Sequence, residues 1–251
     1  MEYFKPLILP ILILSIWIAV SYNGIVSEYL IPSPAKVLSA AVDLYKRDIL
    51  QKHIATSMWR VITGFSIAIS IAIPLAILLY WSRRIEKYLS FMLEFIRSTP
   101  PLALVPLLIL WLGIGEALKI TIIILATFFP LFLNTLSGLK NVDKKLIEMA
   151  NTIELTKWEK LLFVLIPGSL PSIVTGLRLG FGYSWRALIG AELIAASAGL
   201  GYMILDAEAL AQTDVVFVGI VVIGTFGYLF DLIFRRIINY FFFYMNIGEQ
   251  L

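Results

Sequence analysis

The sequence predicts an all-α, polytopic membrane protein with about six transmembrane helices, and two observations support this prediction. Of the 251 residues, 60% are hydrophobic and only 15% are charged, whereas soluble domains are about half apolar and about a quarter charged. The apolar residues are also gathered in runs of about 20, the length that a helix needs to cross a bilayer. The chain has no cysteine, which excludes disulfides, thiolate metal sites and cysteine nucleophiles.

Six stretches are long and apolar enough to cross the membrane, and little chain remains outside them. They are residues 6–22, 57–81, 88–112, 117–137, 170–197 and 214–234. The first stretch could be a cleaved signal peptide, because Ala19 and Ser21 form a small-x-small pair. An uncleaved first span is the simpler interpretation in a polytopic chain. We therefore expect a single transmembrane domain over residues 1–251.

The distribution of basic residues predicts the orientation of the chain. If the N-terminus is inside, the inner loops hold eleven Lys and Arg residues: Lys5, Arg83, Arg84, Lys87, Lys140, Lys144, Lys145, Lys157, Lys160, Arg235 and Arg236. The outer loops then hold four: Lys36, Lys46, Arg47 and Lys52. Because cytoplasmic loops carry the excess of Lys and Arg, we expect both termini to be cytoplasmic and the protein to lie in the plasma (cell inner) membrane. The net charge of +3 reports this topology rather than nucleic-acid binding.

The connection between the first two spans, residues 32–53, predicts an amphipathic helix at the membrane interface. Its apolar positions recur at helical spacing opposite charged residues: Val37, Leu38, Ala41, Val42 and Tyr45. His53, the only histidine, comes at the end of this connection. One histidine cannot build a metal site, so we expect none here.

The third span contains a predicted break. Arg97 precedes the run Ser98-Thr99-Pro100-Pro101. Thr99 can cap a helix that restarts with Pro100 in its first turn, which is a preferred place for proline. A restart here would leave free N–H groups and the positive end of a helix dipole within the bilayer, beside Arg97.

The segment of residues 138–169, between the fourth and fifth spans, predicts two short helices that meet near Leu155. Asp143 can cap the first helix. Thr156 and Glu159 have the spacing of a capping box at the start of the second, whose apolar face continues to Pro167. Such a helix suits docking into a groove of a cytosolic partner. The alternative is a helix that lies on the lipid headgroups.

The same segment reads E-M-A at residues 148–150, E at 154 and V-L-I-P at 164–167. This pattern resembles the EAA loop of ABC-importer permeases, which is roughly E-A-A, three residues, G, nine residues, I-x-L-P. Two positions depart from it. Met149 replaces the middle alanine, and Glu154 replaces the glycine that breaks the helix. The capping box at Thr156 offers a substitute break.

Further segments extend the resemblance over residues 30–236: LIPSPAKVL, RSTPPLALVPLLILWLGIGEALKI, FFPLFLNTLSGLKNVD and WRALIGAELIAASAGLGYMI. In order and spacing they are similar to permease subunits for nitrate, sulfonate, taurine and related compounds. In that family the EAA loop carries the coupling helix, which seats in the ATPase subunit. The resemblance implies that Glu148, Ala150 and Trp158 lie at or near that contact, with Glu154 and Pro167 at matching positions of the motif.

The resemblance also implies the partners. These are two ABC ATPase subunits, a second permease chain and an extracytoplasmic solute-binding protein, together with membrane lipid and no nucleic acid. We expect the second permease chain to be a second copy of this one, and a heterodimer stays open. The chain has no G-x-x-x-x-G-K-[ST] phosphate loop. We therefore expect ATP to be bound by the ATPase subunits, and this chain to be non-catalytic and to hold no cofactor or metal.

Three ionisable residues at membrane depth are candidates for the path of the solute: Arg97, Arg186 and Glu192. Such residues are costly in a bilayer and mark functional sites. Our hypothesis is that Arg97 and Arg186 line or border a path for an anionic solute. The alternative is that Arg186 pairs with Glu192, in the same or a neighbouring chain, and that Arg97 reaches the headgroups or supports the loop. A separation of six residues on a helix turns Arg186 and Glu192 well apart.

Gly176 and Gly180 form a G-x-x-x-G pair in the fifth span. Small residues at this spacing let two helices pack closely. The pair could lie in a seam between two chains or in the interior of one, and the sequence leaves both open.

The predicted function is therefore that of the transmembrane permease subunit of an ATP-driven ABC importer. It would translocate a small anionic solute, such as nitrate, a sulfonate or taurine, delivered by a binding protein. Vitamin precursors such as pyrimidines stay open. Closure of the ATPases would move the docked loop and open the spans toward the opposite side. The alternative is a self-sufficient secondary transporter or channel, in which Arg97, Arg186 and Glu192 carry ion coupling. Such a carrier has no need of a docking helix.

Overall fold

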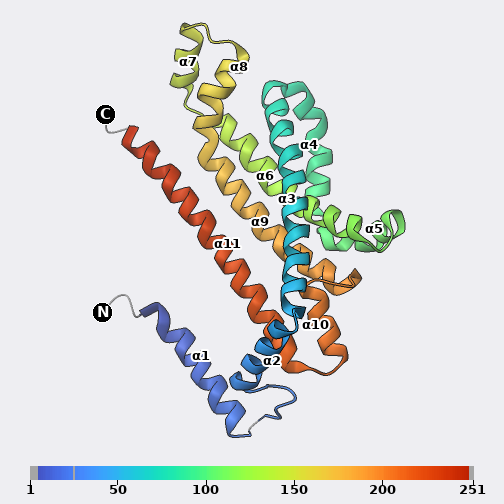
Figure 1. The fold of residues 1–251 in the computed structure, drawn as a ribbon. Helices are drawn as coiled ribbons and strands as arrows, with labels where there is room; N and C mark the ends of the chain where they lie inside the picture. Colours follow the sequence, from blue (N-terminus) through green and yellow to red (C-terminus); the bar gives the residue numbers. More distant parts are fainter. Residues whose placement is uncertain (1–4, 25, 249–251) are drawn as a thin grey trace. The chain divides into compact units, whose positions relative to one another are not determined.

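Helices make up all the regular structure of residues 5–24 and 26–248, the part of the chain that the computed structural model describes (Figure 1). Side chains are described for residues 8–24, 26–82 and 84–237. The elements in chain order are α1 (Lys5–Tyr22), α2 (Pro34–Lys46), α3 (Ile49–Trp81), α4 (Arg83–Ser98), η2 (Pro101–Leu104), α5 (Val105–Leu112), α6 (Glu116–Lys140), α7 (Lys144–Thr152), α8 (Lys157–Lys160), η3 (Leu161–Leu165), α9 (Ile166–Ala195), α10 (Leu200–Ala209) and α11 (Thr213–Gly248). The prediction of an all-α fold is confirmed.

Each of the six predicted spans falls on helical structure. Within the described residues, four helices are long and apolar enough to cross a membrane: Ile49–Trp81, Glu116–Lys140, Lys157–Ala195 and Thr213–Ile237. The helices Arg84–Ser98 and Pro101–Leu112 pass this test only together, as one span broken by a bend of 87°. The remaining helix, Ile8–Tyr22, is apolar but shorter. Four spans, a broken fifth and a short apolar helix agree with the expectation of about six.

Packing divides the chain into two compact units. One consists of Met1–Ser57 with Glu192–Thr225, and the other of Met58–Ala191 with Phe226–Leu251. The first unit holds α1, α2, α10 and the adjoining ends of α3, α9 and α11. The second unit holds all the elements from α4 to α8, with most of α3, α9 and α11.

The amphipathic helix predicted after the first span is α2, in the first unit. The hydroxyl of Ser33 accepts a hydrogen bond from the backbone N–H of Lys36 at the start of this helix. The helix ends at Lys46, earlier than predicted, because Asp48 adopts a left-handed φ of 58° and α3 then begins. Leu38 and Tyr45 on the apolar face of α2 are exposed.

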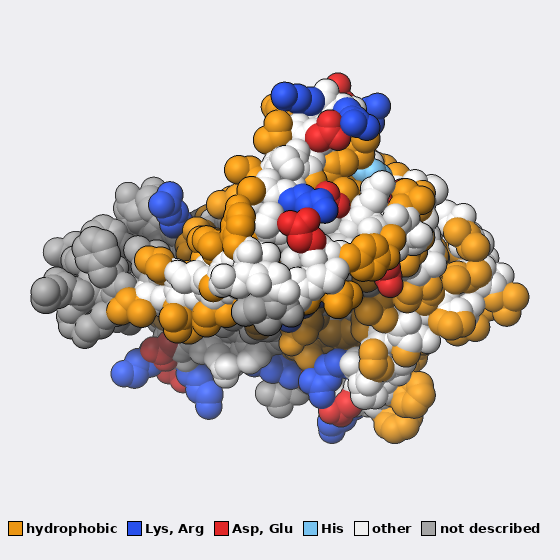
Figure 2. Space-filling view, turned by 90° about the horizontal axis from the view of Figure 1, so that it is seen from below, with side chains coloured by type: hydrophobic (Ala, Val, Ile, Leu, Met, Phe, Trp, Pro, Cys, Tyr) orange, Lys and Arg blue, Asp and Glu red, His pale blue; other side chains and the backbone are white. Residues whose placement is uncertain are grey.

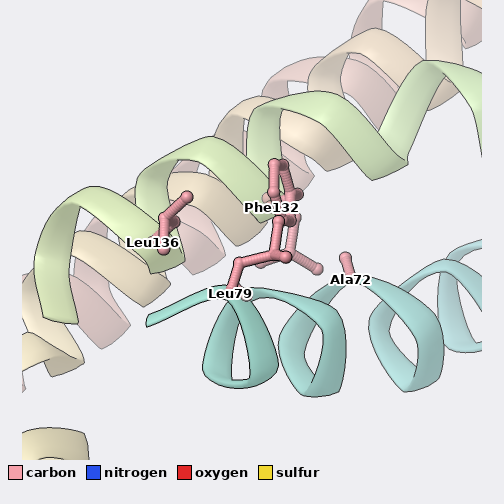
Figure 3. Packing of buried hydrophobic residues seen from close by; sticks show 6 residues of the cluster. Ala72, Leu79, Phe132 and Leu136 are labelled. Atoms are coloured by element: carbon pink, nitrogen blue, oxygen red, sulfur yellow. The ribbon is translucent and has the colours of Figure 1, made fainter. Parts of the chain in front are cut away.

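The core of the second unit lies between α3 and α6. Ala72 and Leu79 of α3 face Phe132 and Leu136 of α6, and all four side chains are buried (Figure 3). The ring of Phe132 and the small side chain of Ala72 belong to the same buried cluster. Close packing of this kind, rather than hydrophobic expulsion from water, holds helices together in a bilayer.

The G-x-x-x-G pair of the fifth span packs inside this chain. A Cβ atom at Gly176 would lie 2.9 Å from the Cβ atom of Asn134 and 3.2 Å from the Cα atom of Leu131, both on α6. A Cβ atom at Gly180 would lie 3.2 Å from the carbonyl oxygen of Thr127, also on α6. Of the two possibilities that the sequence left open, the structure therefore shows an interior contact between α6 and α9.

Hydrophobic side chains cover much of the visible surface (Figure 2). On α4 they form a stripe at helical spacing: Tyr88, Phe91, Met92 and Phe95, all more than half exposed. A soluble monomer rarely exposes so much contiguous apolar surface, whereas lipid tails are as apolar as these side chains. The surface therefore supports the assignment to a membrane.

Candidate functional site

The segment of residues 138–169 forms the two short helices that the sequence predicted, α7 and α8, at the start of the long helix that continues into α9 (Figure 1). The carboxylate of Asp143 accepts a hydrogen bond of 2.9 Å from the N–H of Lys145 at the start of α7. At the start of α8, Thr156 and Glu159 form a capping box in which each side chain bonds the backbone of the other residue. Both predicted caps are confirmed.

The turn between α7 and α8 is made by Glu154, the residue in the glycine position of the EAA pattern. Its φ is 55°, in the left-handed region that glycine favours. The N–H of Leu155 bonds the carbonyl of Ala150 and the N–H of Glu154 bonds that of Asn151, both at 3.0 Å. These two bonds are the Schellman arrangement that ends a helix. The helix therefore breaks at the position of the family's glycine, although Glu154 occupies it. The capping box at Thr156 starts the next helix and does not replace this break.

The segment has one buried side and one exposed side. Ala150 is only 1% exposed, so its side chain anchors α7 and cannot itself offer a contact to a partner. Glu148 and Pro167 are exposed. The apolar side chains of Met149, Ile153 and Trp158 are 55%, 61% and 62% exposed. The outward surface of the segment is thus apolar with charges around it.

Contacts within the second unit hold this exposed surface in place. The Lys160 ammonium donates to the side-chain oxygen of Asn151, which ties α8 to α7. Below the two helices, a buried apolar cluster joins the end of α6 to η3: Leu139, Val142, Leu161 and Leu165. The surface therefore rests on a packed base that is continuous with the spans.

A second feature is an open pocket of about 580 Å³ lined by residues of α4, η2, α6 and α9. Arg97 and Arg186 both line this pocket. These are the two arginines that we expected, from the sequence, to border the path of an anion. Thr99, Asn134 and Tyr183 are its other polar lining residues, and the rest are apolar. Residues about 90 positions apart in the sequence therefore share one cavity.

The two arginines differ in their contacts. The guanidinium of Arg97 donates to Glu94, one turn earlier on α4, at 3.1 Å, and both side chains are largely exposed. The guanidinium of Arg186 lies 5.8 Å from the ring centre of Tyr183, a cation–π contact. No carboxylate lies within ion-pair distance of Arg186 among the side chains that the structure describes.

The helix break beside Arg97 exists, but its start differs from the prediction. Thr99 ends α4 and does not cap the next helix, because the restart is a single 3₁₀ turn, η2, with Pro100 at its N-terminal cap position and no side-chain cap. Pro100 and Pro101 have no N–H, and the N–H of Ala103 already bonds the carbonyl of Pro100. The predicted cap at Thr99 and the row of free N–H groups are therefore wrong. The break itself is seated on α9, where Leu102 packs against Gly190.

Glu192, the third candidate, belongs to the first unit and does not line the pocket. Its side chain is fully buried. Its carboxylate accepts hydrogen bonds of 2.9 Å from the hydroxyl of Ser57 and from the N–H of Gly201 in the first turn of α10. His53 accepts the neighbouring N–H of Gly199 through Nδ1 at 3.1 Å. The carboxylate thus serves as a cap for α10, a stabilising place for a negative charge.

A buried charge cluster in the second unit escaped the sequence analysis. Arg60 and Lys119 are 1% and 3% exposed. Both pair with Glu116, Arg60 through two bonds of 2.6 and 2.7 Å and Lys119 through one of 3.0 Å. The signal was present, because Arg60 and Lys119 both fall inside predicted spans, where basic residues are rare and usually paired.

Comparison with known proteins places these features in context. Residues 64–239 match the family model described as "Binding-protein-dependent transport system inner membrane component". The chain is 37% identical over 233 residues to the putative aliphatic sulfonates transport permease protein SsuC of Bacillus subtilis (strain 168), covering 93% of this chain and 84% of that protein. It is 36% identical over 230 residues to the taurine transport system permease protein TauC of Escherichia coli (strain K12), covering 90% and 84%.

The fold is also found among solved structures. A structure of the MetNI methionine ABC transporter in an inward-facing conformation matches with a TM-score of 0.68, covering 77% of this chain and 96% of that chain. The sequence identity is 17%, so this match bears on the fold alone.

Proposed function

Since the chain belongs to the family of binding-protein-dependent transport system inner membrane components, and is thus a permease subunit of an ABC importer, we propose that its solute is a small organic sulfonate. It is a non-catalytic, multi-pass subunit of the inner membrane that works with ATPase and binding-protein partners. The two relatives named above are permeases for aliphatic sulfonates and for taurine. Taurine is itself an aminosulfonate, so the sulfonate group is what these solutes share.

The finer assembly belongs to the proposal as well. The importer contains two copies of this chain, two ATPase subunits that bind ATP, and one extracytoplasmic binding protein. Both chain termini and the segment of residues 138–169 face the cytoplasm, as the excess of Lys and Arg on that side indicates. The whole chain acts as one permease domain.

The exposed surface of α7 and α8 is the observation that carries the coupling role. Met149, Ile153 and Trp158 project from it, and an amphipathic helix with apolar anchors is suited to a groove in a partner. Tryptophan is among the residues most often found at the energetic centre of an interface. A lipid-facing helix would also expose apolar side chains, and the test below separates the two roles.

The test is assembly of the permease with its ATPase. Trp158→Ala is predicted to weaken the affinity of the permease for the ATPase by about 30-fold, the loss expected for an interface anchor that contributes about 2 kcal/mol. Less ATPase should then co-purify with the permease. Trp111→Ala is the matched control, because Trp111 on α5 is similarly exposed at 68% and lies outside the segment. Unchanged ATPase binding by Trp158→Ala, with the protein folded, would contradict the coupling role. Sulfonate uptake that needs no ATPase would contradict the importer assignment.

A further inference from the structure

The pocket between α4, η2, α6 and α9 is lined by two arginines and, among the residues that the structure describes, by no carboxylate. Arg97 enters from the end of α4 and Arg186 from α9. Among the described side chains that line it there is neither Asp nor Glu. The charged side chains that line this pocket are therefore both basic, which suits an anion.

Both arginines are available to a ligand. Arg186 contacts the ring of Tyr183 and has no carboxylate partner among the described side chains. Arg97 pairs with Glu94, but the two side chains are 48% and 74% exposed. An exposed pair of this kind contributes little, so Arg97 can exchange Glu94 for a bound anion at low cost.

The size and lining of the pocket indicate what else the ligand carries. A volume of about 580 Å³ is in the range of pockets for organic molecules and far larger than nitrate or sulfate needs. Apolar side chains from three elements form most of the wall, among them Leu104, Leu125, Phe129 and Leu179. An ion without an apolar part would leave this wall uncovered.

We propose that this pocket binds the solute within the permease, with the oxygens of an alkyl sulfonate on Arg97 and Arg186 and its hydrocarbon chain on the apolar wall. This inference rests on the proposed function and narrows it. A guanidinium presents several N–H donors in a plane to the oxygens of an oxoanion, and the wall selects for an alkyl group. The absence of a lining carboxylate disfavours an ammonium group, so propanesulfonate binds more tightly than taurine.

The test is direct binding to the purified permease–ATPase complex in nanodiscs, without the binding protein. The probe is radiolabelled hexanesulfonate, measured by equilibrium dialysis. Arg97→Gln and Arg186→Gln are each predicted to weaken binding about 10- to 100-fold, the loss expected for a hydrogen bond to a charged group. Arg186→Lys is predicted to bind with an affinity between those of the parent and Arg186→Gln. Lysine keeps the positive charge but lacks the planar set of N–H donors of a guanidinium. Arg47→Gln is the control and leaves binding unchanged, since Arg47 also pairs with a carboxylate on an exposed helix face but lies outside the pocket.

Competition by other ligands defines the class. Affinity rises by up to about fourfold for each methylene from ethanesulfonate to hexanesulfonate. Hexylammonium, nitrate and sulfate compete weakly, and taurine competes less well than propanesulfonate. Equal competition by nitrate, or by hexylammonium, would overturn the inference.

A lipid phosphate is a second source of the same oxoanion chemistry. Nanodiscs of phosphatidylcholine are therefore compared with nanodiscs that contain phosphatidylglycerol. If the anionic lipid displaces hexanesulfonate, the pocket is a headgroup site and the inference is wrong.

The two proposals fail in different ways. Unchanged hexanesulfonate binding by both Arg→Gln variants, in complexes that retain the ATPase, overturns the pocket alone. Loss of ATPase association by the unaltered chain overturns the proposed function instead. Thermal unfolding of each variant distinguishes a loss of affinity from a loss of folding. If a glutamine variant unfolds, Arg186→Lys and Arg97→Lys are measured in its place. If these lysine variants keep full affinity and prefer taurine, the proposal is contradicted.

Discussion

The hydroxyl of Ser57 lies 2.9 Å from each carboxylate oxygen of Glu192, and neither side chain is exposed. The same hydroxyl oxygen accepts the N–H of Leu200 at 2.9 Å. A residue of α3 and a residue of α9 thereby share the N-terminus of α10 in the first unit. The bonds satisfy donors that the first turn of a helix cannot satisfy itself.

Ser57→Ala is predicted to destabilise the protein by about 1–3 kcal/mol, because it leaves the Leu200 N–H without its acceptor and Glu192 with one donor fewer. Thermal unfolding in detergent measures this effect, and hydrogen exchange should show the loss first at the start of α10. Ser70→Ala is the control. Ser70 is exposed and its hydroxyl bonds only carbonyls of its own helix, so that variant should unfold like the parent. Equal stability of the two variants would contradict the role of Ser57.

Glu154→Gly is predicted to stabilise the segment of α7 and α8 by about 0.5–1 kcal/mol. Glu154 holds a φ of 55°, a conformation that is costly for a residue with a Cβ atom and free for glycine. Ala211→Gly should stabilise the protein in the same way, because Ala211 has a φ of 60° after α10. Ala209→Gly, inside the last turn of α10, is the control and should lose about 0.5–1 kcal/mol. Unfolding temperatures of the three variants decide the matter, and a loss of stability in Glu154→Gly would contradict it.

Gly176→Ala is predicted to destabilise the protein by about 1–3 kcal/mol, the usual cost of overpacking. The added methyl group would meet the backbone of Leu131 on α6, which cannot move aside as a flexible side chain can. Gly182→Ala on the same helix has open space around the new atom and should be neutral or slightly stabilising. The comparison is made by thermal unfolding of both variants in the same detergent. Similar unfolding temperatures would mean that α6 and α9 do not approach so closely.

Glu116→Gln is predicted to cost about 3 kcal/mol, because it removes the carboxylate that Arg60 and Lys119 share while both remain buried. This value is at the low end of the range for broken buried pairs, since Glu116 is itself half-exposed. Lys119→Met should be nearly neutral, because the two hydrogen bonds from Arg60 to Glu116 stay intact. Unfolding temperatures test the order of the two variants. If Lys119→Met is the more harmful one, the cluster depends on its total charge and not on the carboxylate.

The orientation can be tested with single cysteines, because the chain has none of its own. Lys46→Cys, on the predicted outer side, should react with a membrane-impermeant maleimide in intact spheroplasts. Lys145→Cys, at the start of α7, should react only after the membrane is opened. Both lysines are exposed, so this chain itself does not shield either position from the reagent. The reverse labelling pattern would contradict the prediction that both termini are cytoplasmic.

Most of the features that depend on neighbouring residues could be predicted from the sequence. The caps at Asp143 and Thr156 and the break after Ser98 follow from residues within one turn of each other, and local hydrogen bonding decides such features. Contacts across the fold could not be predicted in this way. Periodicity gave no sign that Ser57 would meet Glu192.

The two arginines illustrate the same limit. The sequence identified Arg97 and Arg186 by their cost in a bilayer and suggested that both border the path of an anion, but it did not show which cavity they share. Only the packing of α4 and α9 around a common space puts both into one pocket. Thr99 was mistaken for a cap because the sequence does not tell a 3₁₀ turn from the first turn of an α-helix, and two prolines leave that turn few N–H groups.

The helical run from Lys157 to Ala195 is unbroken, although five of its residues, Leu161–Leu165, form a π-helical turn. Trp158 stands near one end of it, and Arg186 stands on the same run about 40 Å further along, at the usual rise of an α-helix. If the run moves as one rigid body, a movement at its Trp158 end therefore also displaces Arg186. A tilt of about 10° about the end at Trp158 would carry Arg186 about 7 Å. A displacement of that size would change the distance between Arg186 and Arg97 and so the shape of the pocket that both line.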